Sequence, residues 1–343
     1  MTDPTKPGLR ETEIRPDALM DEQARRYAAD IRRLLEHRAR FARVACPACR
    51  YDSSRPAFEK MGFSYVVCSR CETMYANPRP TPELLEMYYT TSENYAYWNA
   101  YIFPASEAVR REKIFAPRAN RLVEICRRHQ IPGETLLEVG AGFGTFCEEI
   151  SRLRYFRRVV AVEPTPDLAA TCRKKGLEVV EKRIEEATID GGPVNAVASF
   201  EVIEHLFEPW QFLAGCARLL PPGGLLILTC PNGKGFDVEV LGPLSSAVDP
   251  EHLNYFHPAS LSLLVTDAGF DVLEALTPGE LDAELVRKKL LSGELDLSQE
   301  PFLKNVLLDR WDVLGASFQQ FIARHRLSSH LWLVARKRVT LAC

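Results

Sequence analysis

Residues 136–146 read Leu-Leu-Glu-Val-Gly-Ala-Gly-Phe-Gly-Thr-Phe, and residues 159–164 read Val-Val-Ala-Val-Glu-Pro. The first stretch places an apolar strand before a turn with glycines at alternate positions. The second is another apolar strand, and it ends in the acid Glu163. Together they have the layout of a nucleoside-binding βαβ unit. The spacing departs from the dinucleotide pattern G-x-G-x-x-G, and Glu138 inside the strand end would repel a pyrophosphate but suits a cationic amino-acid head.

Alternating strands and helices surround this unit, which predicts an α/β fold with a doubly wound, mostly parallel sheet. Seven strands are expected, at residues 135–139, 158–163, 177–180, 195–200, 225–229, 270–276 and 330–335. Helices are expected at residues 210–220 and 259–268, the first ended by Pro221-Pro222-Gly223-Gly224. The segment 278–328 is expected to be a helical insertion before the last strand.

Four of the ten cysteines are closely spaced as two C-x2-C pairs: Cys46, Cys49, Cys68 and Cys71. This spacing is typical of a tetrahedral Zn²⁺ site, with an intervening segment long enough for a β-hairpin. The alternative is two unrelated pairs of reduced thiols. The other six are interpreted as small buried hydrophobic residues: Cys126, Cys147, Cys172, Cys216, Cys230 and Cys343.

We divide the chain into four parts. Residues 1–45 are a tail and helix, with disorder expected over 1–15 and a helix from about Pro16 to Arg43. Residues 46–80 are a zinc-ribbon-like module, residues 81–130 are aromatic-rich connecting helices, and residues 131–343 are the nucleoside-binding α/β domain. Within 88–103 seven aromatic side chains crowd together. They are either a lid over the site or core packing between domains.

The pattern Glu138-x-Gly140-x-Gly142-x-Gly144 resembles motif I of the class I S-adenosylmethionine (SAM) methyltransferases, and the resemblance runs from about residue 110 to the end. It implies a seven-stranded Rossmann-like methyltransferase sheet whose last strand runs antiparallel beside the fifth. It also implies SAM as the cofactor. Glu138 would serve the amino group of SAM, and Glu163 its ribose hydroxyls. The other expected cofactor contacts are Gly140, Ala141, Gly142, Gly144, Pro164, Phe200 and Glu201. Many relatives have an acid beside the adenine after the third strand, whereas this stretch departs from the pattern and reads Glu181-Lys182-Arg183-Ile184-Glu185.

The string Glu201-Val-Ile-Glu204-His205 resembles the segment after the fourth strand of small-molecule methyltransferases, notably the ubiquinone-biosynthesis O-methyltransferases. On one helical turn Glu201, Glu204 and His205 could converge and hold a divalent cation. The alternative is that Glu201 caps the turn while His205 packs under the cofactor.

In such relatives the loop after the fifth strand borders the methyl acceptor. An imidazole with a near-neutral pKa can take the proton of an acceptor hydroxyl, which makes His252 the first candidate for a catalytic base and His205 the second. The alternative for His252 is that it orders the loop, and His257-Pro258 is expected to start the next helix.

The chain of 343 residues has a net charge of −3, which offers no electrostatic footprint for nucleic acid. It has no apolar run long enough to span a bilayer and no signal peptide, so we expect a cytoplasmic protein. The predicted function is O-methylation of a small polar acceptor, such as a sugar, nucleotide sugar or glycan precursor in polysaccharide biosynthesis. Sugar C-methyltransferases resemble the chain through a similar four-cysteine module, but their larger C-terminal domain favours O-methylation here. The alternatives are C-methylation, RNA methylation and a SAM-binding scaffold without catalysis.

Overall fold

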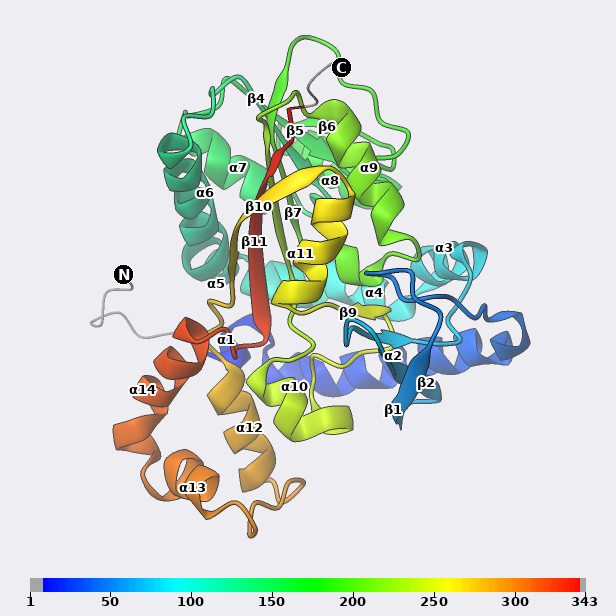
Figure 1. Ribbon diagram of the computed structural model, residues 1–343, viewed down its shortest axis with the longest axis vertical. Helices are drawn as coiled ribbons and strands as arrows, with labels where there is room; N and C mark the ends of the chain where they lie inside the picture. Colours follow the sequence, from blue (N-terminus) through cyan, green and yellow to red (C-terminus); the bar gives the residue numbers. More distant parts are fainter. Residues whose placement is uncertain (1–8, 340–343) are drawn as a thin grey trace.

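The computed structural model describes residues 9–339, and its largest unit is a seven-stranded sheet in the order β10-β11-β8-β7-β4-β5-β6 (Figure 1). Strands β4 to β8 are parallel, and β11 runs antiparallel between β8 and β10. The strands are β4 (Thr135–Val139), β5 (Arg158–Val162), β6 (Glu178–Val180), β7 (Val194–Phe200), β8 (Leu225–Pro231), β10 (Phe270–Leu276) and β11 (His330–Lys337). The seven expected strands and the antiparallel last strand are confirmed.

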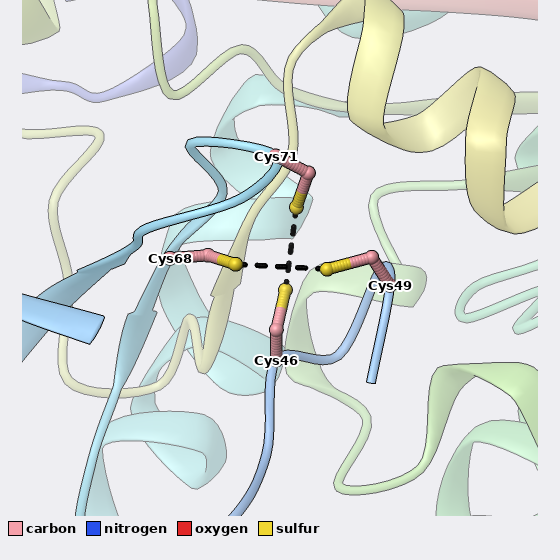
Figure 2. Close-up of side chains that lie close together, drawn as sticks. All are labelled: Cys46, Cys49, Cys68 and Cys71. Carbon is pink, nitrogen blue, oxygen red and sulfur yellow. Dashed lines mark hydrogen bonds between the residues drawn. The ribbon is translucent and has the colours of Figure 1, made fainter. Parts of the chain in front are cut away.

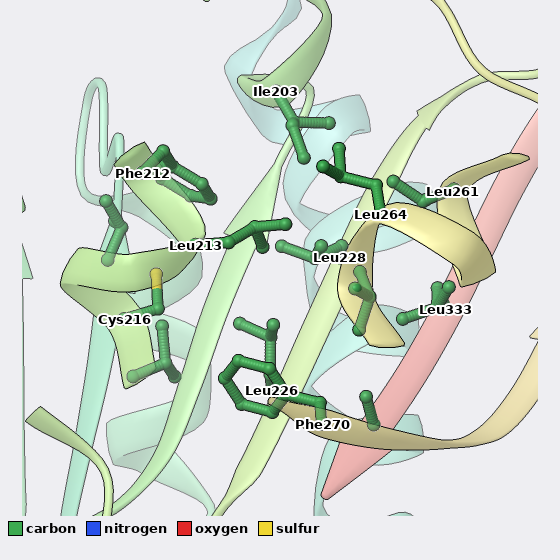
Figure 3. Packing of buried hydrophobic residues seen from close by; sticks show 14 of the residues in the cluster. Ile203, Phe212, Leu213, Cys216, Leu226, Leu228, Leu261, Leu264, Phe270 and Leu333 are labelled. Atoms are coloured by element: carbon green, nitrogen blue, oxygen red, sulfur yellow. The ribbon is translucent and has the colours of Figure 1, made fainter. Parts of the chain in front are cut away.

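Helices cover both faces of this sheet, because neighbouring residues of each buried strand point to opposite sides. Leu226 and Leu228 of β8 pack against α9 (Pro209–Leu219) and α11 (Pro258–Asp267), as Figure 3 shows. Ile227 of β8 packs with α6 (Ala116–Arg128) and α7 (Thr145–Arg152) on the other face. Helix α8 (Pro166–Lys174) follows β5.

The order of the strands reverses beside β4. From β4 the chain moves outward to β5 and β6, then returns to β7 on the other side of β4. In open α/β sheets such a switch point opens a crevice outside the carboxyl ends of the strands, where ligands bind. The fold therefore places the candidate site at the ends of β4, β5 and β7.

A second, four-stranded antiparallel sheet has the order β1-β2-β3-β9 and includes Cys68, while Cys46, Cys49 and Cys71 lie in adjoining turns and loops. Strands β1 (Ser54–Lys60) and β2 (Phe63–Cys68) form the expected hairpin, and β3 (Met74–Ala76) follows it. The fourth strand, β9 (Asn254–Tyr255), comes from the loop after β8. Tyr65 and Tyr255 of this sheet pack with Ile31 of α2 (Asp17–Glu36) and Leu84 of α3 (Pro82–Thr91).

The N-terminal helices differ from the prediction in two respects. The helix expected from about Pro16 to Arg43 is shorter, because α2 ends at Glu36 and a 3₁₀ turn follows it. The expected disorder over residues 1–15 is wrong in its described part, because Glu11–Ile14 form the short helix α1 next to α5 (Phe103–Arg110). Arg110 of α5 donates to the carbonyl of Ile14. Residues 1–8 lie outside the described residues. The other N-terminal elements are η1 (Arg38–Arg40), α4 (Glu93–Tyr97) and the π-helical turns η2 (Trp98–Ile102) and η3 (Arg111–Phe115).

The insertion before β11 is helical, as expected, and has its own small core. Val286 and Leu307 of the insertion pack against Leu241 of α10 (Phe236–Leu241). Its elements are α12 (Asp282–Leu291), α13 (Pro301–Lys304), η6 (Asn305–Asp309) and α14 (Trp311–Arg324). The remaining turns are η4 (Ile203–His205) and η5 (Gly242–Leu244). No helix between residues 9 and 339 is long and apolar enough to cross a bilayer.

Five of the six scattered cysteines are buried, as expected: Cys126, Cys147, Cys172, Cys216 and Cys230. The sixth, Cys343, lies outside the described residues.

Candidate active site

The turn after β4 combines left-handed backbone with open space. Gly140 and Gly142 have φ angles of 76° and 56°, which favour glycine. A Cβ on Gly140 would lie 2.4 Å from Cγ2 of Val202, so the protein itself requires that glycine. A Cβ on Gly142 would meet no atom within 4 Å. Gly142 therefore faces space in which a ligand could lie against the backbone.

Glu163 lies directly after β5 with its carboxylate turned to this glycine turn. Its Oε2 accepts the N–H of Gly142 at 2.8 Å, and its Oε1 accepts the N–H of Thr165 at 2.9 Å. Burial raises the pKa of Glu163. Each carboxylate oxygen still has a lone pair beyond its backbone partner, so both can accept from neighbouring hydroxyls. Pro164, another expected cofactor contact, follows it and is exposed.

Glu138 lies in β4 and is almost completely buried. Its Oε2 accepts from Sγ of Cys147 in α7 at 2.9 Å. Burial raises its pKa to about 8, against the opposing effects of the Cys147 thiol and Arg118. A cation bound beside Glu138 would stabilise the ionised carboxylate, because an opposite charge favours the charged form. This arrangement suits the ammonium group that the sequence assigned to it.

The structure corrects the expected grouping of Glu201 with Glu204 and His205 on one helical turn. Glu201 has a left-handed φ of 55°, and the 3₁₀ turn η4 begins only at Ile203. The spacing of a regular helix therefore does not apply to this segment. Oε1 of Glu201 instead accepts from Thr229 Oγ1 at 2.6 Å.

An arginine and a histidine also lie near Glu201, and burial lowers the pKa of His330. The Arg118 guanidinium is 3.7 Å from Oε1, and Nδ1 of His330 is 3.5 Å from the same oxygen. Arg118 also lies over the ring of Phe200 at the end of β7, 4.7 Å from its centroid. The Phe200 ring also packs against the rings of Phe146 and Trp332, with centroids 4.7 Å and 6.0 Å away.

Glu204 and His205 instead meet His252, with one possible ligand atom from each residue lying within 4.8 Å of the others. Nδ1 of His205 is 3.1 Å from the carbonyl of Glu251, and Nδ1 of His252 is 3.0 Å from the carbonyl of Ala247. Because a carbonyl only accepts, we assign the proton to Nδ1 in both rings, which leaves a lone pair on each Nε2. Loop 247–252 thus orients two imidazoles toward one place.

Burial shifts the pKa values of both Glu204 and His205 in the direction that favours the uncharged form. Burial, and then the neighbouring His252, lower the pKa of His205 to about 3. Burial and Glu201 raise the pKa of Glu204 well above its usual value. Neither carboxylate oxygen of Glu204 has a hydrogen-bond partner among residues 9–339. An unpaired buried carboxyl is costly, so it points to a ligand at this place.

Tyrosines of the aromatic segment reach the same loop. Tyr88 and Tyr95 donate to the carboxylate of Glu251, and the Tyr89 hydroxyl lies 3.2 Å from Nδ1 of His205. Burial raises the pKa of Glu251 to about 8. These contacts pack α3 and α4 against the loop and the turn that carry Glu204, His205 and His252.

The end of the aromatic segment, residues 88–103, lies against the glycine turn after β4. The ring of Phe103 stacks on Phe143 of the glycine turn, with centroids 3.7 Å apart and planes 8° from parallel. The segment thus packs against the glycine turn and the histidine cluster, and its expected role as a lid over the site stays a prediction.

Sequence reasoning missed several residues that touch the site. Arg118 lies on α6, the helix before β4. An arginine on such a polar helix has no neighbouring sequence pattern that marks it as a site residue. Cys147 was interpreted only as a hydrophobic residue, although its thiol donates to Glu138. Thr229 and His330 belong to strands distant in the sequence, and only the fold brings them to Glu201.

The four cysteines of the small sheet point toward one centre (Figure 2). Their sulfur atoms lie within 4.8 Å of one another, with Cys46 and Cys71 separated by 3.4 Å and Cys49 and Cys68 by 3.6 Å. Sulfur atoms at the corners of a tetrahedral zinc site are separated by about 3.8 Å, given a Zn–S bond of about 2.3 Å. The donors and their spacing therefore fit zinc.

Comparison with known proteins agrees with the geometry of the βαβ unit. Residues 108–275 match a family of methyltransferase domains. The chain therefore carries a class I SAM-dependent methyltransferase domain. The matched residues hold β4 to β8, the glycine turn and the cluster of Glu204, His205 and His252, while the four cysteines lie outside them.

Among similar curated proteins is a ubiquinone biosynthesis O-methyltransferase of Xanthomonas oryzae pv. oryzae, 34% identical over 131 residues, or 36% of this chain and 54% of the relative. Another is a protein of Mycolicibacterium smegmatis named as a probable SAM-dependent methyltransferase, 30% identical over 150 residues, or 43% of this chain and 56% of the relative. The chain thus spans little more than half the length of these relatives. A SAM-dependent methyltransferase structure from Archaeoglobus fulgidus is 18% identical and covers 69% of this chain and all of its own, with a TM-score of 0.46.

Proposed function

We propose that the protein transfers the methyl group of SAM to a hydroxyl of a small polar acceptor, with a sugar, nucleotide sugar or glycan precursor as the favoured class. The observation that carries the proposal is the free lone pair on Nε2 of His252. This ring lies beside η4, which follows the carboxyl end of β7. Bound SAM supplies an activated methyl group on a sulfonium. The chain's own residues must hold the two substrates in line and take one proton.

His252 is the proposed base. Its ring is oriented by the carbonyl of Ala247, and its Nε2 lone pair can accept the acceptor's hydroxyl proton as the oxygen–carbon bond forms. The sulfur–carbon bond breaks in the same step, so the proton on His252 is the only charge left for the protein to carry. His205 is a poor base in comparison, because its pKa is lowered to about 3. We propose that His205 positions the acceptor or His252.

For the cofactor, we propose one part of SAM for each of three sets of residues. Glu138 would hold the ammonium, Glu163 the ribose hydroxyls, and the Gly140-Ala141-Gly142 backbone the methionine part. Gly144 directly precedes α7, Phe200 ends β7, and Glu201 follows it.

A screen with methyl-labelled SAM tests the function. Nucleotide sugars, free sugars and RNA are offered in parallel, and the labelled product is examined by NMR. We expect label on the oxygen of a sugar. Label on a sugar carbon would establish C-methylation instead, label in RNA would establish the RNA alternative, and SAM binding without transfer to any acceptor would favour a scaffold.

His252→Ala tests the proposed base. With the acceptor that the screen identifies, we expect turnover to fall by roughly 10²–10⁴ while SAM affinity stays unchanged, since this is the usual worth of general acid–base catalysis. His325→Ala is the control, because His325 is an exposed histidine at the end of α14. Full activity of His252→Ala would leave that residue a structural part only.

A divalent cation is the second candidate for this cluster, carried by the unpartnered carboxylate of Glu204. Glu204, His205 and His252 could supply one oxygen and two nitrogens, and backbone carbonyls orient both rings as is usual for metal-bound histidines. This set replaces the group of Glu201, Glu204 and His205 expected from the sequence. Turnover that is lost after chelation and restored by Mg²⁺ or Mn²⁺ would favour the cation over the base.

We further propose that Cys46, Cys49, Cys68 and Cys71 bind one structural Zn²⁺. The separations of the sulfur atoms support this, and thiolate ligation would tie the metal to the folding of the small sheet. Elemental analysis of protein purified without chelator should give one zinc per chain, and Cys68→Ser should lower that content. Protein without zinc would contradict this proposal.

A further inference from the structure

The small cysteine sheet includes part of the loop that carries His252. Met74 and Tyr75 of β3 pair with Tyr255 and Asn254 of β9, and the N–H of Ala76 donates to the carbonyl of Leu253 at 3.0 Å. Strand β9 begins two residues after His252. The position of His252 thus depends on a strand pairing that involves the cysteine module.

A second contact joins the metal-site turn directly to the other end of this loop. Nε2 of His257 lies 2.8 Å from the backbone carbonyl of Cys71, and His257 is the residue that precedes α11. Because a carbonyl only accepts, Nε2 carries the proton in this contact. The turn that holds Cys71 therefore contacts the chain on the far side of β9 from His252.

Asn254 links β9 to the turn that carries Glu204 and His205. Its side chain is fully buried, and its Nδ2 donates to the carbonyls of Ile203 at 3.2 Å and Leu206 at 2.8 Å. The buried Arg79, just after β3, donates to Oδ1 of Asn254 at 2.8 Å. The side-chain amide of Asn254 thereby connects the segment of His205 and the segment of His252 to the sheet of the cysteine module.

The ladder between β3 and β9 is short, and its surroundings are also held by the packing of Tyr255 against Ile31 and Leu84 and by Tyr88 and Tyr95, which donate to Glu251. Strands of two and three residues pair weakly by themselves, so they need support from outside the ladder. A metal that joins four thiolates supplies such support, because its binding free energy is gained only in the folded module. The hydrogen bonds of Glu138 and Glu163 come instead from Gly142, Cys147 and Thr165, all within the βαβ unit.

We infer that the metal bound by the four cysteines positions the acceptor half of the active site, which is the cluster of Glu204, His205 and His252. It does so by fixing β9 and, through Asn254, this cluster. The cofactor half, which is the βαβ unit, keeps its structure without the metal. The inference rests on the proposed zinc site. Asn254 is a positioning residue in this scheme, since it acts through the histidine-bearing segments.

Amide hydrogen exchange of the full-length protein, with its metal and after chelation, tests the inference together with a SAM titration. We expect exchange over residues 249–257 and 203–206 to speed up by roughly tenfold or more after chelation, since local opening sets exchange rates. Peptides of β7 serve as the internal reference, and SAM affinity should change by less than about twofold. Restoring Zn²⁺ should restore slow exchange.

Asn254→Ala tests the link without removing the metal. It should retain one zinc per chain yet speed exchange over residues 203–206. Asn195→Ala is the matched control, because Asn195 is also a buried amide, and its Oδ1 accepts from the N–H groups of Glu134 and Thr135 at 3.2 Å, at the start of β4.

Three outcomes would overturn the inference. If chelation speeds exchange over residues 46–76 but not over 249–257, the module is independent and only the zinc proposal survives. If SAM affinity is lost in parallel, the metal supports the whole domain rather than the acceptor half. If the purified protein holds no zinc, both the zinc proposal and this inference fail.

Discussion

Glu138 shows at the scale of a single residue how burial prepares a site for its ligand. The pKa of its carboxyl is raised to about 8, chiefly by burial, so the cofactor-free protein holds it mostly protonated at neutral pH. Binding an ammonium group beside it requires the carboxylate, and the proton must leave. SAM affinity is therefore expected to be linked to pH through this residue.

The sign of that dependence follows from the raised pKa. As the pH rises from about 6 toward 8, less free energy is needed to ionise Glu138, so SAM affinity should increase, by at most about tenfold per pH unit. Calorimetric titrations across this range, in buffers of different ionisation enthalpy, also count the released protons. Glu138→Gln should bind more weakly and show a flatter profile. An equal slope in that variant would assign the dependence to another group.

The same raised pKa affects the stability of the cofactor-free protein in the opposite direction. Between the unfolded pKa of about 4.5 and the folded value, the native state binds more protons than the unfolded state. The free energy of unfolding should therefore fall as the pH rises through this window, at up to about 1.4 kcal/mol per pH unit for this one group. Denaturant unfolding of the protein and of Glu138→Gln at several pH values measures the difference.

Sequence reasoning could place Glu138 and Glu163 because their register is local to one βαβ unit. It could not place Glu201, because its spacing to Glu204 suggests a helix while the left-handed backbone at Glu201 turns the chain out of β7. It also named His205 and His252 separately. Only the fold brings their ring centroids to 4.7 Å.

At the scale of elements, the strands of the large sheet were predictable because each is an apolar run bounded by turn residues. The two-residue strand β9 was not, since so short a strand has no pattern of its own and exists through its partner β3. The short helix α1 was missed for a similar reason, as three of its four residues are polar and it lies beside α5.

Helix α5 covers the glycine turn through one aromatic contact, which can be tested at this scale. Phe103→Ala removes the ring stacked on Phe143, so a ligand at the turn should exchange with solvent more easily. We expect the dissociation rate of S-adenosylhomocysteine, followed by stopped-flow fluorescence, to rise several-fold. Tyr101→Ala is the control, because Tyr101 lies in the same segment and is 56% exposed. Equal rates in both variants would make α5 packing only.

At the scale of the whole molecule, two sheets meet at one site. The large sheet supplies the cofactor unit, and the small sheet carries the cysteines and includes β9 from the loop of His252. The sequence indicated both parts through their motifs. Their connection could not be predicted, because the contacts join residues near 75 to residues near 254 without any shared local pattern.

The central claim is that the βαβ unit of residues 138–163 binds SAM, and calorimetric titration of four proteins tests it most directly. The wild type should bind one SAM per chain. Gly142→Leu should weaken binding at least about tenfold because its side chain would occupy the ligand's space, whereas Gly223→Leu carries similar left-handed strain in a turn before β8, also with no atom near its Cβ, and should bind normally. Glu163→Gln should also weaken binding, since it removes one of two acceptors for the ribose. Unchanged affinity in both Gly142→Leu and Glu163→Gln, with thermal unfolding showing intact folds, would place the cofactor elsewhere and contradict the account.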